Sequence, residues 1–238
     1  MDEKRLFANI CKKNGSEISE EQLDQLERFV AALRRWNQKI NLISRKDEEN
    51  IWKFHIYHCA SLLFTLLIEH ESKVIDIGTG GGLPGIPLKI LRPDLQMTLL
   101  DSIEKKTIAV QSILSELSIP GVTVRRGRVE ELGKSPKDSN RFHIAVARAV
   151  APLRNLALWS KPILHARQND EKETEQTAPR PKVIPPALIA MKGGDLTDEL
   201  HQVGKVAGIR DVQTFNLPPY NAAQASNNDK KVVLITFR

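Results

Sequence analysis

Apolar residues in the first seventy positions recur with the spacing of helices. Residues 19–41, SEEQLDQLERFVAALRRWNQKIN, carry one such stripe at intervals of three or four, the period of a helix face. Its members are Leu23, Leu26, Val30, Leu33, Asn37 and Ile40. Ser19 and Gln22 predict a capping box at its start. Residues 51–70, IWKFHIYHCASLLFTLLIEH, predict a second helix, so we expect a helical N-terminal cap over residues 1–70.

From residue 73 onward, short apolar runs alternate with helical patterns. Strands are predicted at 74–77, 97–101, 122–126, 142–149, 187–193 and 231–237. Helices are predicted at 84–91, 103–117, 153–165 and 196–206, and Pro84 suits a first helical turn. This alternation is typical of a doubly wound α/β domain with a mainly parallel sheet, which we expect over residues 71–238.

Two polar stretches interrupt the alternation. Residues 167–186, RQNDEKETEQTAPRPKVIPP, are rich in charge and proline and predict a flexible surface insertion. Residues 216–229, NLPPYNAAQASNND, predict a loop before the final strand.

The distribution of charge bears on whether the protein binds nucleic acid. The chain has a net charge of +6, and residues 71–165 hold 14 Lys and Arg against 9 Asp and Glu. A positive face there would attract a polyanion such as nucleic acid, with binding that weakens in salt. A mildly basic solvated surface would explain the same count.

Other features bound the class of protein. Cys11 and Cys59 lie far apart, which argues against a zinc site or a disulfide framework and favours a reducing compartment. No apolar run reaches membrane-spanning length, and the start, MDEKRLFANICKKNG, does not resemble a signal peptide. We therefore expect a soluble, cytoplasmic protein that needs no metal.

A glycine-rich turn, within KVIDIGTGGGLPGIPLKI at 73–90, follows the first strand. One register, acid-x-Gly-x-Gly-x-Gly, consists of Asp76, Gly78, Gly80 and Gly82. A later register, formed by Gly80, Gly82 and Gly85, matches the dinucleotide fingerprint. That fingerprint should begin at the strand end, which would put its last glycine at Leu83. Position therefore favours the first register and S-adenosylmethionine, which has no pyrophosphate; a turn that serves only packing is the alternative.

Acids and an apolar residue follow the next two strands. Asp101 ends the second strand, where an ionised carboxylate can accept hydrogen bonds from both hydroxyls of a ribose. NAD would use the same acid, so Asp101 does not separate the two cofactors. After the third strand, Val129 and Glu130 are placed near an adenine ring, although their spacing alone favours a helix start with an acidic first turn.

The loop after the fourth strand, ARAVAPL at 147–153, faces the reactive end of a methyl donor in such sheets. It lacks the Asn/Asp-Pro-Pro-aromatic motif of amine methylation, and no nearby cysteine could add to a pyrimidine. A similar string, NLPPY at 216–220, lies in the last loop and is interpreted as a stiff turn. An acceptor with a free lone pair, such as guanine N7, needs no general base, so positioning supplies most of its catalysis.

Arg148 is the candidate catalytic residue of this loop. Its guanidinium could contact the carboxylate of the donor, an RNA phosphate or guanine O6. An ion pair at the end of the strand is the structural alternative.

Together these segments resemble the bacterial ribosomal RNA small-subunit methyltransferase G family, also called glucose-inhibited division protein B. The matching stretches are LRRWNQKINLIS (33–44), FHI (54–56), IDIGTGGGLPGIPL (75–88), LLDSIEKK (99–106), RVEEL (128–132), ARAVA (147–151) and AMKG (190–193). The resemblance implies a Rossmann-like methyltransferase with a sheet of seven-stranded type. It also implies S-adenosylmethionine-dependent methylation of guanine N7 in 16S rRNA, free or in the assembling small subunit. We expect the protein to be a monomer.

The same resemblance assigns site residues. Donor contacts are expected from Gly78, Leu83, Val129, Glu130 and Arg148, with Asp101 at the ribose. Lys192, in AMKG, would lie near the site and contact RNA. The chain departs from the family at residues 55–59, where His-Ile-Tyr-His-Cys stands for the common His-Ile-x-Asp-Ser and His58 replaces the acid.

Three other functions remain open at this stage. The first is a methyltransferase of the same fold that acts on a protein or small molecule. The second is a nucleotide-binding or redox protein that uses Gly80, Gly82 and Gly85. The third is a donor-binding RNA module without activity.

Overall fold

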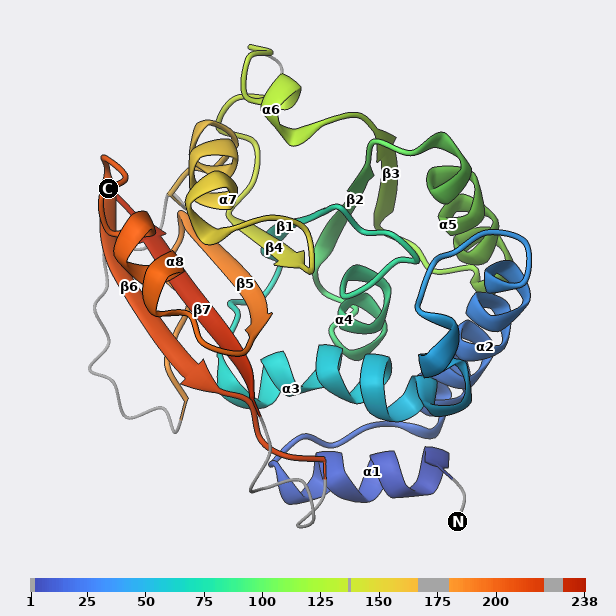
Figure 1. The fold of residues 1–238 in the computed structure, drawn as a ribbon. Coiled ribbons are helices and arrows are strands. Elements are labelled where there is room, and N and C mark those ends of the chain that lie inside the picture. The colour runs from blue at the N-terminus through green and yellow to red at the C-terminus, as the bar shows by residue number, and fades with distance from the viewer. Residues whose placement is uncertain (1–2, 137, 167–179, 221–228) are drawn as a thin grey trace.

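The computed structural model, which describes residues 3–136, 138–166, 180–220 and 229–238, is built on one seven-stranded sheet (Figure 1). The strand order is β3-β2-β1-β4-β5-β7-β6. The strands are β1 (Lys73–Ile77), β2 (Gln96–Asp101), β3 (Val122–Arg126), β4 (Ile144–Arg148), β5 (Ala187–Gly193), β6 (Ile209–Asn216) and β7 (Lys230–Phe237). Strands β1 to β5 pair in parallel, whereas β7 is antiparallel to β5 and β6. The predicted doubly wound, mainly parallel fold is confirmed.

Helices cover both faces of this sheet. They are α1 (Glu3–Lys13), α2 (Glu20–Asn37), α3 (Tyr57–Thr65), α4 (Gly85–Leu91), α5 (Glu104–Leu117), α6 (Val129–Leu132), α7 (Leu153–Ser160) and α8 (Thr197–Val203). Short helical turns form η1 (Arg45–Asn50), η2 (Trp52–Ile56) and η3 (Lys161–Ile163). Figure 1 shows α7 and α8 together on one side of the sheet and α2 to α5 on the other.

Alternation along the strands divides the apolar residues between two cores. Val74 of β1 packs in the core that also holds the buried residues of α1, α2 and α3. Ile75 and Ile77 face the other core, against α7 and α8. Because successive side chains point to opposite faces, Asp76 lies on the face of Val74, toward α4. The N-terminal helices therefore share a core with the sheet.

The first predicted helix is confirmed but ends four residues early. Ser19 and Gln22 form the predicted capping box at the start of α2. At the other end, buried Asn37 accepts hydrogen bonds from the backbone amides of Leu42 and Ile43 at 2.8 and 2.9 Å. A side chain that holds the next loop in this way replaces the continuation of the helix.

The second predicted helix, 51–70, is divided. A π-helix, η2, precedes α3, and the helix stops at Thr65 because Leu66 is extended. Leu67 then forms a parallel bridge with Lys182, and Val183 is buried. Near its end, the predicted 167–186 insertion is thus paired with Leu67 at residues 181–183 rather than free, and this pairing overrides its polar composition. Residues 167–179 lie outside the described residues.

Helix α1 and strand β6 are not among the predicted elements. Helix α1 buries Phe7, Ile10 and Cys11 on one side, a stripe too short to stand out from the sequence alone. Strand β6, IRDVQTFN, alternates poorly because it is an edge strand, and its pairing with β7 decides its conformation.

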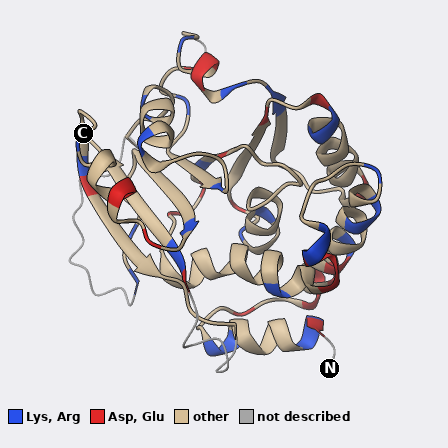
Figure 2. Cartoon of the chain, in the orientation of Figure 1, with Lys and Arg blue, Asp and Glu red and all other residues tan. Residues whose placement is uncertain are grey.

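Charge is spread over the surface of the chain. Figure 2 shows Lys and Arg on α2, α5 and α7, interleaved with acidic residues. In the part of the chain that the structure describes, no helix is long and apolar enough to cross a membrane.

Candidate active site

The site lies where the strand order of the sheet reverses. Strands β1 and β4 are neighbours, with Ile77 paired to Ala147, but the chain leaves β1 toward β2 and reaches β4 only after β3. The loops after β1 and β4 therefore run in different directions from the carboxyl ends of the strands, where sheets of this kind bind ligands in a crevice. These loops carry the glycines and Arg148.

Backbone conformation explains three of the predicted glycines. Gly78, Gly80 and Gly82 have φ angles of 68°, 57° and 86°, a region that side chains rarely adopt. A Cβ on Gly78 would also lie 2.8 Å from a methyl of Val150. A Cβ on Gly80 would meet only backbone oxygens at 3.9 Å, so this part of the loop leaves room for a ligand.

Asp101 ties the glycine loop to the end of β2. Its Oδ2 accepts a hydrogen bond from the Gly80 amide at 2.9 Å, and its Oδ1 accepts one from the Ile103 amide at 2.9 Å. A carboxylate oxygen can accept more than one hydrogen bond, so both oxygens retain capacity for ligand hydroxyls. Asp101 thus holds the glycine loop in place and can still accept hydrogen bonds from the hydroxyls of a ribose.

Asp76 holds the glycine loop through hydrogen bonds of its buried carboxylate. Its buried Oδ2 accepts hydrogen bonds from Thr79 Oγ1 at 2.7 Å and from the Gly85 amide at 2.9 Å. Its Oδ1 is buried and has no hydrogen-bond partner among the described residues. An orphaned oxygen of this kind is suited to a polar group of a bound ligand.

Burial raises the pKa of Asp76 to about 7, and the charge of Asp101 adds to this effect. The bonds from Thr79 and Gly85 and the charge of Arg148 oppose it. A carboxyl with this pKa exists in both forms at neutral pH, so its Oδ1 can donate to or accept from a ligand.

Gly82 and Leu83 contribute to the packing of the glycine-rich turn. A Cβ on Gly82 would lie 2.4 Å from Ile86 Cδ1. Leu83 is 7% exposed, and its amide donates to the carbonyl of Thr79 at 2.9 Å. In this structure both residues pack beneath the loop, so any contact of Leu83 with a donor remains a prediction.

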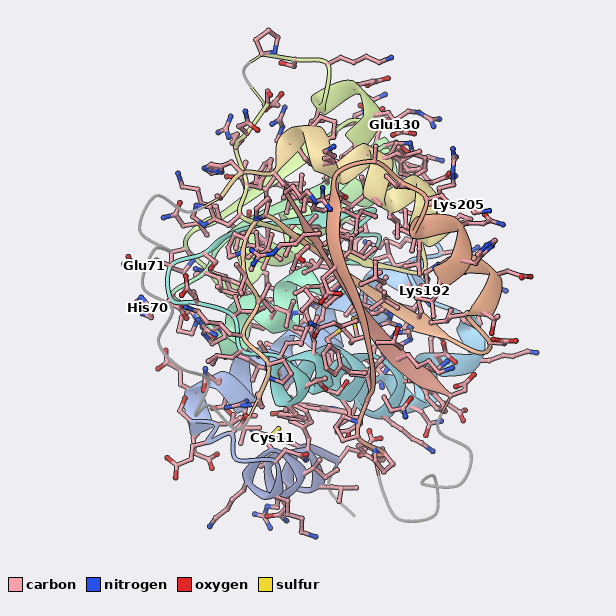
Figure 3. The ribbon with its side chains drawn as sticks, turned by 90° about the vertical axis from the view of Figure 1, so that its left-hand side faces the viewer. Cys11, His70, Glu71, Glu130, Lys192 and Lys205 are labelled. Atoms are coloured by element: carbon pink, nitrogen blue, oxygen red, sulfur yellow. The ribbon has the colours of Figure 1, made fainter. Side chains whose placement is uncertain are left out.

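Val129 and Glu130 begin α6, as the helix-start interpretation of their spacing predicts. Val129 is buried, whereas Glu130 is partly exposed and lies near the top of Figure 3. The amide of Gly127, just before them, donates to the carbonyl of Asp101 at 3.0 Å. This bond brings the start of α6 close to Asp101.

Arg148, the last residue of β4, contacts η2 and α3. Its Nη2 lies 2.5 Å from His55 Nδ1 and 3.5 Å from the carbonyl of Phe54, and its Nη1 is 3.5 Å from Cys59 Sγ. Among the described residues, no carboxylate forms an ion pair with it. The strand-end ion pair offered by the sequence as an alternative is therefore absent there.

His58 adds a second buried imidazole near Arg148. Burial lowers its pKa to about 3, with contributions from the charges of Arg148 and Lys230. Its Nε2 has no hydrogen-bond partner among the described residues. His58 is thus neutral and does not form an ion pair with Arg148.

His58 should make the fold sensitive to acid. Its imidazole is neutral in the fold but charges in the unfolded chain below its ordinary pKa of 6.5, so stability falls as pH drops from 6.5 toward 3. We expect His58→Asn to lose less stability than the native chain between about pH 6.5 and 4.5. Urea unfolding at each pH measures this difference, and parallel stability curves for the two proteins would contradict it.

Lys192 lies on β5 and is held by neighbouring groups. Its Nζ contacts Glu199 Oε2 at 2.7 Å and donates to the carbonyl of Ala151 at 2.9 Å. Figure 3 shows Lys192 beside the ribbon of β5 and α8. Glu199 also accepts from the Leu153 amide at 2.7 Å, so Lys192 anchors the loop after β4 in this structure. Its predicted contact with RNA remains a prediction.

Sequence reasoning assigned no role to His55, Phe54, Cys59 or Val150, which surround Arg148 and Gly78. The first three contact Arg148 from more than 80 positions away in the chain, so no local spacing could reveal them. The expectation that no cysteine lies near Arg148 is wrong for the same reason, since Cys59 Sγ is 3.5 Å from Arg148 Nη1. The FHI string inside the apolar run was the one available signal. No group of three His, Cys, Asp or Glu suited to a metal occurs among the described residues.

Comparison with known proteins identifies the family of the chain. The family model for rRNA small subunit methyltransferase G matches residues 22–171, which include the glycine loop, Asp101 and Arg148. The chain belongs to this family. A ribosomal RNA small subunit methyltransferase G from Chlorobium chlorochromatii is 37% identical over 83% of this chain and 74% of its own length. One from Phocaeicola vulgatus is 36% identical over 92% and 94%.

Solved structures share the fold at low sequence identity. A predicted O-methyltransferase from Agrobacterium tumefaciens is similar with a TM-score of 0.53, at 10% identity, over 76% of this chain and 80% of its own. The YcgJ protein from Bacillus subtilis gives a TM-score of 0.51, at 12% identity, over 77% and 100%. These similarities support the Rossmann-like architecture.

Proposed function

We propose that this member of the family transfers a methyl group from S-adenosylmethionine to N7 of a guanine in 16S rRNA. The observation that carries the proposal is that the glycine loop, Asp101 and Arg148, all within the family segment, lie at the carboxyl ends of the neighbouring strands β1, β2 and β4. We further propose that it acts as a monomer in the cytoplasm, on free rRNA or on the assembling small subunit.

Methyl transfer to guanine N7 depends mainly on how the protein positions the two reactants. S-adenosylmethionine, when bound, supplies a methyl group on a positively charged sulfur. In the transfer, the guanine N7 lone pair forms the new N–C bond as the S–C bond breaks, and its electrons remain on sulfur. No proton has to leave N7 first, so the protein needs to hold the two reactants in line rather than provide a general base.

The residues of the site can each take part in holding the reactants. The open backbone at Gly80 leaves room for the donor, and Asp101 accepts from its ribose while holding the loop. The orphaned Asp76 Oδ1 is available to a polar group of the amino acid end. The guanidinium of Arg148, whose direct partners among the described residues are neutral, attracts an anionic group, either the donor carboxylate or an RNA phosphate.

Asp101→Ala should weaken donor binding. It removes the ribose acceptor and also frees the Gly80 amide, so we expect a loss of about 1–3 kcal/mol. Calorimetric titration with S-adenosylhomocysteine measures this loss. Asp211→Ala, at an exposed acid on β6, is the control, and unchanged affinity in Asp101→Ala would refute the ribose assignment.

The function is tested directly by methyl transfer. The purified protein is incubated with S-adenosylmethionine carrying a labelled methyl group and with unmodified 16S rRNA, either free or as ribonucleoprotein. Strand cleavage at N7-methylguanine then maps the product, and one labelled guanine is expected. Donor binding without transfer to either substrate would point to another acceptor, and binding of NAD in place of the donor would point to a nucleotide-binding protein.

A further inference from the structure

We propose that His55 is a positioning residue that orients the Arg148 guanidinium toward an anionic ligand group by accepting a hydrogen bond as a neutral imidazole. This inference rests on the proposed function, whose reaction gives Arg148 its task. It gives η2 a role in the site, the orientation of the Arg148 guanidinium, which neither the glycine loop nor Asp76 and Asp101 perform.

The hydrogen bond has only one direction. A guanidinium can donate but cannot accept, so His55 Nδ1, 2.5 Å from Arg148 Nη2, must be the acceptor. The ring hydrogen then lies on Nε2. That atom is buried, and Asp47 Oδ2 lies 3.4 Å from it, close enough to favour a hydrogen there although the two atoms do not form a hydrogen bond.

An unusual turn of the backbone carries His55 to Arg148. His55 is 4% exposed and belongs to the π-helix η2, in which the Tyr57 amide donates to the carbonyl of Trp52. π-helical turns are rare and occur frequently at functional sites. The same turn presents the Phe54 carbonyl to Arg148 Nη2 at 3.5 Å, so two adjacent residues hold one end of the guanidinium.

Neutral partners preserve the charge of Arg148. Its partners among the described residues are an imidazole, a carbonyl and a thiol, and burial with the charge of Arg148 keeps the pKa of His55 near 3. A carboxylate in the place of His55 would orient the guanidinium equally well but would neutralise it. The charge of Arg148 and its unused N–H groups can therefore bind a carboxylate or a phosphate.

The test uses three variants of His55 in the full chain. Asn at this position can offer an oxygen near the place of Nδ1, whereas Gln extends past it and Ala offers nothing. We expect His55→Ala and His55→Gln to lower, about tenfold, whichever quantity Arg148→Ala lowers, donor affinity or transfer rate. His55→Asn should stay within about threefold of the native protein. Equal losses in Asn and Ala would overturn the acceptor role.

A double-mutant cycle separates positioning from general support of the fold. If His55 acts through Arg148, His55→Ala should cause little further loss in an Arg148→Ala background. Multiplying losses, or an Arg148→Ala protein with unchanged binding and transfer, would overturn the proposal. His143→Ala is the matched control: this buried imidazole also accepts at Nδ1, from the Lys73 amide at 3.1 Å, but at the amino edge of the sheet.

Two readouts keep this proposal distinct from the proposed function. S-adenosylhomocysteine binding by calorimetry needs no RNA, and transfer to 16S rRNA needs both substrates. Loss of donor affinity in His55→Ala that His55→Asn restores supports the positioning role even if 16S rRNA is not the acceptor. Melting temperatures of all variants show whether each is folded.

Discussion

Arg148→Ala is expected to lower kcat/KM for methyl transfer about 100-fold or more, the largest functional effect of any single substitution considered. The guanidinium has no carboxylate partner among the described residues, so its charge is available to a ligand. Two charge-assisted hydrogen bonds to that ligand, each worth about 1.5–3 kcal/mol, account for this factor. Steady-state kinetics with labelled donor and 16S rRNA measure it.

Arg148→Lys and Arg154→Ala complete the experiment. Lysine keeps the charge but loses the planar fork and the bond to His55, so it should recover only part of the activity. Arg154 is exposed on α7, and its removal should leave turnover unchanged. Turnover near the native level in Arg148→Ala, with the protein folded, would remove Arg148 from the site.

Gly85→Ala is expected to destabilise the fold by about 3 kcal/mol or more and to impair donor binding as well. An added Cβ would lie 2.2 Å from Leu99 Cδ2 and 2.8 Å from Asp76 Oδ2. Both neighbours are buried, so the start of α4 must move away from β2. That movement would break the Gly85–Asp76 hydrogen bond that braces the glycine loop.

Urea unfolding and calorimetric titration with S-adenosylhomocysteine measure the two effects of Gly85→Ala. Gly204→Ala is the matched control, because its Cβ would meet the nearest atom, the Leu200 carbonyl oxygen, at an ordinary 3.5 Å. A Gly85→Ala protein with native stability and donor affinity would show that α4 does not need this close approach.

Local pattern determined most of the fold. The stripe from Leu23 to Asn37 and the apolar runs at β1 to β5 and β7 are properties of neighbouring residues, so their periods are readable from the chain. The glycine spacing after β1 and the acid after β2 are likewise local. For this reason the candidate donor loop and Asp101 could be named before the fold was known.

Tertiary structure decided the rest, because the remaining contacts join distant parts of the chain. Strand β6 exists through its pairing with β7, and residues 181–183 are paired with Leu67. Asp76 belongs to a sequence motif, but only the packing of α4 shows that it braces the loop. His55 and Arg148 are 93 positions apart in the chain, and only the tertiary fold brings η2 to the end of β4. The partners that the guanidinium finds in this buried place are neutral groups.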